Sequence, residues 1–212
     1  MSNLKTILKR IRNELKEKEN VRESSQAEMR RATSLSKRAI LLIHQRKMNE
    51  AKKLITCVAE IMAKLKVASE TYPSLIYCGM YSVAFQEYSE ASIFLKLAEE
   101  SRFATPEEIN VPSVDYVLGL ADVIGEYRRL TLDALREGDI QKSEECLQKM
   151  DEIYVELMGM DESYMLVAGL RRKCDVARKI IEITRGDVTQ ELRRSKLETY
   201  LRRFEKQVGK AR

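Results

Sequence analysis

Seven residues between Ile76 and Leu97 follow alternating steps of four and three, the pattern of a helix packed lengthwise against another helix. Most of the seven are apolar, but the central two are carboxylates, Glu87 and Glu90. A carboxylate that faces a packed interior costs several kcal/mol unless a cation meets it. Neither acid has a basic residue three or four positions away on its own helix. The pair therefore indicates metal ligands or half of a buried ion-pair network. The full repeat is Ile76, Met80, Val83, Glu87, Glu90, Phe94 and Leu97.

A second segment, residues 111–125, contains only two charged residues, Asp115 and Asp122, and Glu126 follows it directly. Apolar residues occupy nearly every other direction around this segment, so it is predicted to form a buried helix. Asp122 and Glu126 are then buried or line a cavity. Gly119 stands one turn before Asp122, where a glycine costs a helix about 1 kcal/mol relative to alanine. We expect it to leave space beside the acids for a metal ion and its waters.

Four carboxylates at helical spacing on two helices can converge on one divalent cation. All-oxygen ligation selects Mg²⁺, Mn²⁺ or Ca²⁺ over zinc or copper. The alternative is a set of salt bridges between helices, with Arg128, Arg129 or a lysine elsewhere in the chain as the cation. The pattern alone leaves both interpretations open. The four candidates are Glu87, Glu90, Asp122 and Glu126.

Other metal sites have less support in the sequence. A di-iron bundle requires two Glu-x-x-His motifs, and the only histidine, His44, is not part of one. The four cysteines are far apart and form no C-x-x-C pair, which indicates free thiols rather than disulfides or a zinc site. They are Cys57, Cys78, Cys146 and Cys174.

Three segments resemble the translin family. QEYSEA (Gln86–Ala91) and VDYVLGLADVIGEYRR (Val114–Arg129) are similar to the acidic segments of that family, and most similar to those of its catalytic member, translin-associated factor X. SKRAILLIH (Ser36–His44) is similar to the early helix of the same protein. The resemblance extends from about Ser36 to the final helix. The charge-rich composition is compatible with an archaeal homologue.

The resemblance implies a Mg²⁺-dependent endoribonuclease that cleaves single-stranded RNA, with Mn²⁺ as a possible substitute. It assigns metal binding and catalysis to Glu87, Glu90, Asp122 and Glu126, and cleavage to metal-assisted hydrolysis of the phosphodiester. It further implies a closed homo-oligomeric shell, an octamer, with the acids facing an enclosed space. Two alternatives remain. One is a non-catalytic protein that binds single-stranded RNA or DNA, as translin does, and the other is a purely structural helical module.

The net charge of +5 is unevenly distributed along the chain. Residues 1–53 carry +9 and residues 188–212 carry +5, so the middle is strongly acidic. Basic ends around an acidic middle suit a protein that holds a polyanion against a metal-dependent site, although solvated faces of Lys/Glu-rich helices would look the same. Lys37, Arg38 and His44 lie on the helix that the resemblance places in the family's nucleic-acid-handling assembly. They are therefore candidate phosphate contacts.

Periodicity and helix-breaking residues predict an all-α fold, an antiparallel bundle of about seven helices in one domain over residues 1–212. Gly186 is expected to end the sixth helix and Asp187 to begin the last. The sequence has no apolar stretch that could span a membrane and no secretory h-region near its start, so a cytoplasmic location is expected. The expected helices cover residues 4–46, 49–69, 73–101, 113–138, 139–159 and 161–185, and a final segment from 187.

Overall fold

The computed structural model describes residues 3–76 and 79–210. These residues form seven α-helices, α1–α7, and one short 3-10 helix, η1, with no strand among them. The predicted all-α class is thereby confirmed. The chain divides into two compact units, Met1–Gly119 and Leu120–Arg212, and the division falls within α5 (Ser113–Glu137). No helix in the described ranges is long and apolar enough to cross a membrane.

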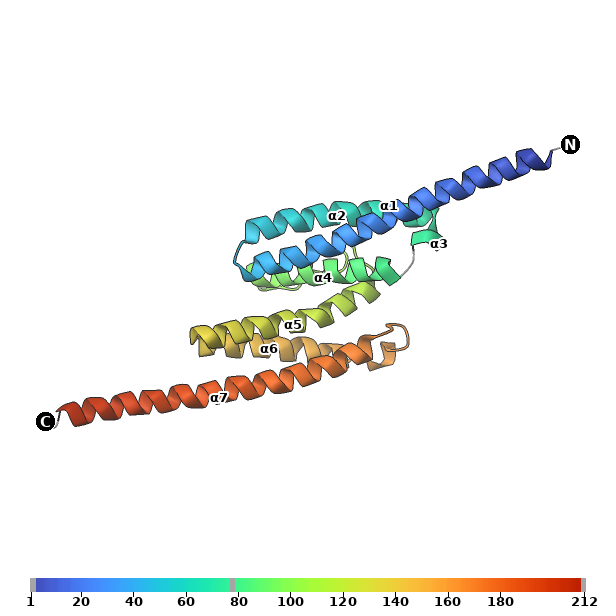
Figure 1. The fold of residues 1–212 in the computed structure, drawn as a ribbon. Helices are drawn as coiled ribbons and strands as arrows, with labels where there is room; N and C mark the ends of the chain where they lie inside the picture. Colours follow the sequence, from blue (N-terminus) through green and yellow to red (C-terminus); the bar gives the residue numbers. More distant parts are fainter. Residues whose placement is uncertain (1–2, 77–78, 211–212) are drawn as a thin grey trace. The chain divides into compact units, whose positions relative to one another are not determined.

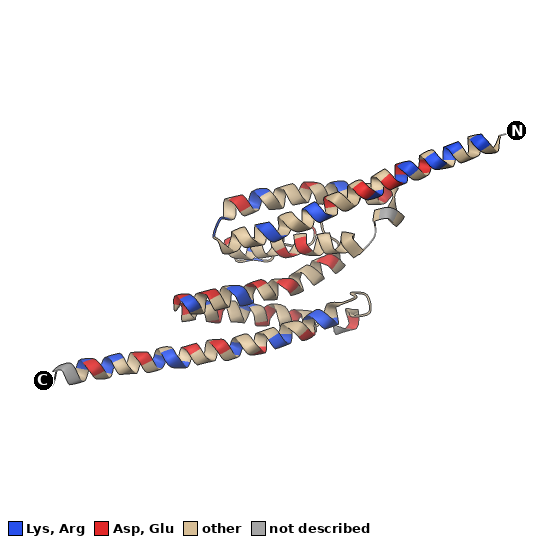
Figure 2. Ribbon diagram, in the orientation of Figure 1, with Lys and Arg blue, Asp and Glu red and all other residues tan. Residues whose placement is uncertain are grey.

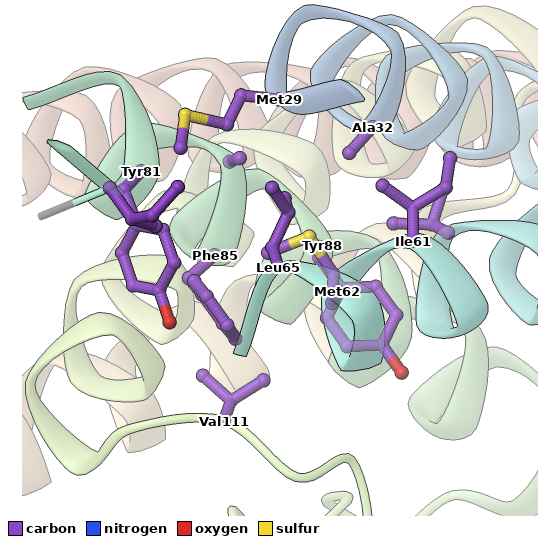
Figure 3. Packing of buried hydrophobic residues seen from close by; sticks show 12 residues of the cluster. Met29, Ala32, Ile61, Met62, Leu65, Tyr81, Phe85, Tyr88 and Val111 are labelled. Carbon is purple, nitrogen blue, oxygen red and sulfur yellow. The ribbon is translucent and has the colours of Figure 1, made fainter. Parts of the chain in front are cut away.

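The first unit is built on three long helices that pack against one another, and α1 is antiparallel to α2 while α2 is antiparallel to α4 (Figure 1). Apolar residues at helical spacing on all three helices meet in one core. Figure 3 shows Met29 of α1, Leu65 of α2 and Phe85 of α4 within it. Each such side chain contributes about 1.5–3 kcal/mol when it is fully buried. The helices of this unit are α1 (Leu4–His44), α2 (Met48–Thr71), α3 (Pro73–Ile76), α4 (Gly79–Glu100) and the first two turns of α5.

An ion-pair network holds the segment between α4 and α5 in place. Arg102 donates two hydrogen bonds of 2.8 Å to Glu108, and Lys96 of α4 lies 3.1 Å from the same carboxylate. Lys66 of α2 reaches Asn110 at 2.7 Å. Hydrogen bonds from Arg102 and then Lys96 lower the pKa of Glu108 to about 2. This network connects the loop to two helices, and it thereby positions the start of α5.

The second unit contains the rest of α5, α6 (Ile140–Met158), η1 (Asp161–Ser163) and α7 (Leu170–Lys210). Gly138, with φ of +78°, ends α5 in the left-handed conformation that favours glycine. Asp139 then caps α6 by accepting a hydrogen bond of 2.9 Å from the Lys142 amide. Helices α6 and α7 pack together, and Arg185 of α7 pairs with Asp151 of α6 at 2.7 Å.

The predicted break at Gly186 is wrong, because α7 runs through it as one helix from Leu170 to Lys210. Residues 161–169 instead form η1 and turns. The buried face of α7 continues past the glycine, since Thr184 and Val188 are both buried on it. Packing of that face outweighs the cost of about 1 kcal/mol for a glycine within a helix. The predicted third helix is also divided, into α3 and α4, with Tyr77 and Cys78 outside the described residues.

Replacing Gly186 with Ala is expected to raise the free energy of unfolding by up to about 1 kcal/mol. The added methyl group would meet no atom within 4 Å, so only the gain in helix propensity remains. Urea unfolding followed by circular dichroism measures the change. A loss of stability would show that the helix does not continue through position 186.

Candidate functional site

Glu87 and Glu90 lie on the inner side of α4, as the sequence predicted. Glu90 is buried, with 8% of its surface exposed, and the Glu87 side chain is largely covered. Lys37 of α1 lies 3.1 Å from Glu87, between Nζ and Oε1. The cation beside this acid therefore comes from another helix, 50 residues earlier in the chain. Lys37 was predicted as an RNA contact, and the structure brings it to the acids.

The repeat that predicted this arrangement is only partly buried. Phe94 and Leu97 are buried as expected, but Val83 is 46% exposed. Tyr81 and Phe85 occupy the core in its place. Helix α4 packs against both α1 and α2, so its buried face is wider than a single stripe. The buried positions therefore do not follow a strict seven-residue repeat.

Gly119 allows the first part of α5 to lie directly on the backbone of α4. A Cβ atom at this position would stand 2.6 Å from Ser89 Cβ and 2.7 Å from the carbonyl oxygen of Gln86. The expectation that Gly119 leaves room for a metal and its waters is therefore wrong. The space is filled by α4 itself, and the glycine is what permits this close approach. The contact places the second turn of α5 beside residues 86–90 of α4.

Asp115, in the first turn of α5, is a buried acid with hydroxyl and amide partners. Ser82 of α4 donates a hydrogen bond of 2.5 Å to its carboxylate, and Gln86 donates one of 2.9 Å to the Ser82 hydroxyl. Burial raises the pKa of Asp115, and the hydrogen bonds from Ser82 and Gln86 oppose that rise. The carboxylate ties α5 to α4 one turn before Gly119.

Replacing Asp115 with Asn is expected to raise the free energy of unfolding at pH 7. The amide oxygen can accept the Ser82 hydrogen bond without a buried charge. Because the folded-state pKa of Asp115 lies above its unfolded value, the folded protein binds more protons between those two values, and wild-type stability falls as pH rises through that window. Urea unfolding from pH 3 to 7 should show a flatter profile for the variant. A variant less stable than wild type at pH 7 would contradict this account.

Asp122 and Glu126 lie on the part of α5 that belongs to the second unit, and both are half-buried. Lys173, near the start of α7, donates a hydrogen bond to Asp122 Oδ2. Sequence reasoning did not identify Lys173, since it stands 51 residues from Asp122 and lies in an ordinary basic stretch. Each pair of predicted ligands thus contains one acid that pairs with a lysine from another helix.

The described residues contain no group of three or more His, Cys, Asp or Glu side chains placed to hold a metal ion. The donor chemistry of the four acids nevertheless fits Mg²⁺ or Mn²⁺, because each offers carboxylate oxygens. Lys37 and Lys173 each supply positive charge to one of these acids. A carboxylate that contacts an ammonium group can exchange that partner for a divalent cation.

The other predicted RNA contacts, Arg38 and His44, lie on the same helix as Lys37. The His44 ring packs on Phe94, with ring centroids 5.1 Å apart. Arg38 lines a shallow groove with Glu50 and Lys53, on the side of α1 that faces α2. Lys37 contacts Glu87, one of the predicted metal ligands.

The described cysteines are free thiols, as predicted. They are Cys57, Cys146 and Cys174, whereas Cys78 lies outside the described residues. Burial raises the pKa of the Cys146 and Cys174 thiols. A raised pKa lowers the fraction of reactive thiolate, so these two cysteines have a packing role.

Comparison with known proteins identifies close relatives over most of the chain. The model of the Translin family matches residues 9–183. An uncharacterised protein of Methanocaldococcus jannaschii is 32% identical over 199 residues, which cover 93% of this chain and 87% of the relative.

Solved structures show the same relationship. The crystal structure of AfC3PO is 34% identical, with a TM-score of 0.77, and the match covers 87% of this chain and 96% of that one. The complex of AfC3PO with duplex RNA has the same identity, a TM-score of 0.76, and coverage of 87% and 95%. Apo-NeC3PO, at 22% identity, a TM-score of 0.80 and coverage of 90% and 100%, is similar in fold.

Proposed function

This chain belongs to the Translin family, and from that premise we propose that it is a Mg²⁺-dependent endoribonuclease that cleaves single-stranded RNA. RNA is the proposed ligand because AfC3PO, 34% identical to this chain, has been solved in complex with duplex RNA. We propose one translin-like domain over residues 1–212, since the family match extends across both units.

The observation that carries the proposal is the pairing of one acid in each half of the site with a lysine from another helix. Glu87 pairs with Lys37, and Asp122 pairs with Lys173. Both positions thus present a carboxylate that attracts a cation, and carboxylate oxygens are the donors that Mg²⁺ prefers.

In this proposal Glu87, Glu90, Asp122 and Glu126 hold Mg²⁺, and Mn²⁺ can replace it. The bound ion would polarise the scissile phosphate and lower the pKa of the attacking water. One of the four carboxylates can instead accept the proton of that water. Lys37, Arg38 and His44 remain the proposed RNA contacts on α1, and Lys37 lies 3.1 Å from Glu87 of the proposed site.

Cleavage of end-labelled single-stranded and duplex RNA, with Mg²⁺, with Mn²⁺ and with EDTA, tests this function. We expect single-stranded RNA to be cut only when one of the two metals is present. The second candidate is a non-catalytic protein that binds single-stranded RNA or DNA. It is favoured by the arrangement of the described residues, in which no three His, Cys, Asp or Glu side chains are placed together to hold a metal ion. Binding without cleavage under every metal condition would establish it and exclude the nuclease.

We further propose that the chain forms a homo-oligomeric shell, an octamer. Figure 1 shows the first half of α1 extending beyond α2 and α4, and within the second unit the last half of α7 extending beyond α6. Charged residues surround both extensions (Figure 2), but each also carries an exposed apolar stripe at helical spacing. On α1 this stripe continues the face that is buried further along the helix, so a second copy is its proposed partner. The stripes are Leu4, Leu8, Ile11 and Leu15 on α1 and Leu197, Tyr200, Leu201 and Phe204 on α7.

Replacing Leu8 and Leu15 together with Glu is expected to lower the oligomeric mass of the protein. Both side chains are exposed in the single chain, so the monomer fold should persist while the apolar contact between copies is lost. Light scattering coupled to size-exclusion chromatography measures the mass, and circular dichroism checks the helix content. Arg10→Glu, on the polar side of the same helix, is the control. An unchanged mass would show that this stripe is not an interface.

A further inference from the structure

A surface groove in the first unit runs between α1 and α4 beside Glu87. Its volume is about 400 Å³, within the range of small-molecule binding sites. One wall combines cationic and hydroxyl side chains from α1, and the other wall is apolar and comes from α4. The lining residues are Arg30, Thr33, Ser34 and Lys37 of α1 and Met80 and Val83 of α4.

We propose that this groove binds one nucleotide of an RNA strand, with its phosphate on Arg30 and Lys37 and its base against Met80 and Val83. The proposal rests on the function proposed above and adds a substrate-binding site to it. It makes Arg30 a substrate-binding residue, which no motif of the sequence indicated.

The cationic wall is suited to a phosphate group. Arg30 and Lys37 are seven residues apart on α1, which is nearly two helical turns, so they face the same side. Within the described residues Arg30 has no ion pair, whereas its neighbour Arg31 lies 3.7 Å from Glu28. An arginine that no carboxylate occupies can offer its paired N–H groups to phosphate oxygens. The charge of this wall therefore favours an anionic ligand.

The apolar wall contains an exposed valine near the start of α4. Val83 is 46% exposed although most of α4 is buried, and with Met80 it forms a small apolar surface. Such a surface can pack on the face of any base, so it predicts little sequence preference. Thr33 and Ser34 lie between Arg30 and Lys37 in the sequence of α1, and their hydroxyl groups can bond to a ribose.

Lys37 links the groove to the acids, because it lines the groove and also lies 3.1 Å from Glu87. A strand held in the groove therefore brings its backbone to the side of α4 that carries the predicted metal ligand. If a divalent cation takes the place of Lys37 at Glu87, the lysine becomes available to the same phosphate. The groove thus positions substrate for the acids.

The test compares Arg30→Gln with Arg31→Gln in the full-length chain. Both variants remove one positive charge from neighbouring exposed positions of α1, and the Arg31–Glu28 pair on the surface contributes little. Affinity for a fluorescent oligouridine is measured in EDTA at several salt concentrations. We expect Arg30→Gln to weaken binding about tenfold and to reduce the salt slope by about 0.7. Arg31→Gln should stay within about twofold of wild type.

A second variant tests the apolar wall. Val83→Ser is expected to weaken binding about threefold to fivefold without changing the salt slope, because no charge is lost. The exposed position leaves folding intact, which circular dichroism confirms. If the wild-type chain binds the oligonucleotide and Arg30→Gln and Arg31→Gln bind it with equal affinity, the groove is not the binding site. The proposed RNA-binding function would then be unaffected. Failure of the wild-type chain to bind the oligonucleotide would overturn both.

Discussion

Replacing Asp122 with Asn is expected to reduce Mg²⁺-dependent RNA cleavage by at least about 100-fold, while RNA affinity in EDTA stays within about twofold. Asparagine keeps the size of the side chain and one oxygen but removes the negative charge that attracts a cation. In the structure that charge is met by Lys173. A side chain that binds the metal and does not contact the RNA strand should affect the rate of cleavage far more than the affinity for RNA. Single-turnover cleavage of labelled single-stranded RNA at saturating Mg²⁺ measures the rate.

Asp133→Asn provides the matched control for this variant. Asp133 lies on the same helix, is half-buried to nearly the same extent as Asp122, and forms an ordinary pair with Arg136 at 3.1 Å. Its replacement removes the same charge and should leave both cleavage and binding unchanged. If Asp122→Asn and Asp133→Asn cleave RNA equally well, Asp122 has no part in the mechanism. If Asp122→Asn loses RNA binding and cleavage together, Asp122 stabilises the fold or contacts the RNA strand, and it is not a metal ligand.

The second large effect is expected for Gly119→Ala, which should lower the free energy of unfolding by about 3 kcal/mol. The new methyl group would stand 2.7 Å from the carbonyl oxygen of Gln86 and 2.6 Å from Ser89 Cβ. A backbone atom cannot move aside as the end of a flexible side chain can, so α5 has to shift away from α4. Urea unfolding at pH 7 measures the loss.

Gly125→Ala on the same helix separates this close contact from helix propensity. An added Cβ at position 125 would meet nothing within 4 Å, so this change should stabilise the protein by up to about 1 kcal/mol. The two variants make the same substitution in one helix and are expected to have effects of opposite sign. Stabilisation by Gly119→Ala would mean that α5 does not approach α4 as the structure shows.

Much of the fold could be predicted from local sequence. The helical class follows from the 3.6-residue period, and the end of α5 and the start of α6 follow from Gly138 and Asp139, whose preferences act over one turn. Gly186 shows the limit of such reasoning. Its local preference for a helix end is worth about 1 kcal/mol, and the buried face around Thr184 and Val188 overrides it.

The candidate site likewise contains residues that the sequence could identify and residues that it could not. The sequence pointed to Glu87 and Glu90 because acids interrupt an apolar repeat, and the structure does place both on the inner side of α4. It could not identify Lys173, since nothing in a basic stretch 51 residues away marks one lysine as the partner of Asp122. The expectation of open space at Gly119 was wrong, because the absence of a side chain is compatible both with open space and with close packing of a neighbouring helix.

By itself the sequence determined that the chain is helical, that two of its helices carry acids on apolar faces, and that it resembles the translin family. Each of these follows from preferences or motifs that operate within one segment. Only the tertiary structure decided which cations meet the acids, how closely α5 approaches α4, and that Arg30, Lys37 and Val83 share one groove. Those properties depend on side chains that packing brings together from distant parts of the chain, and the order of residues does not record such distances.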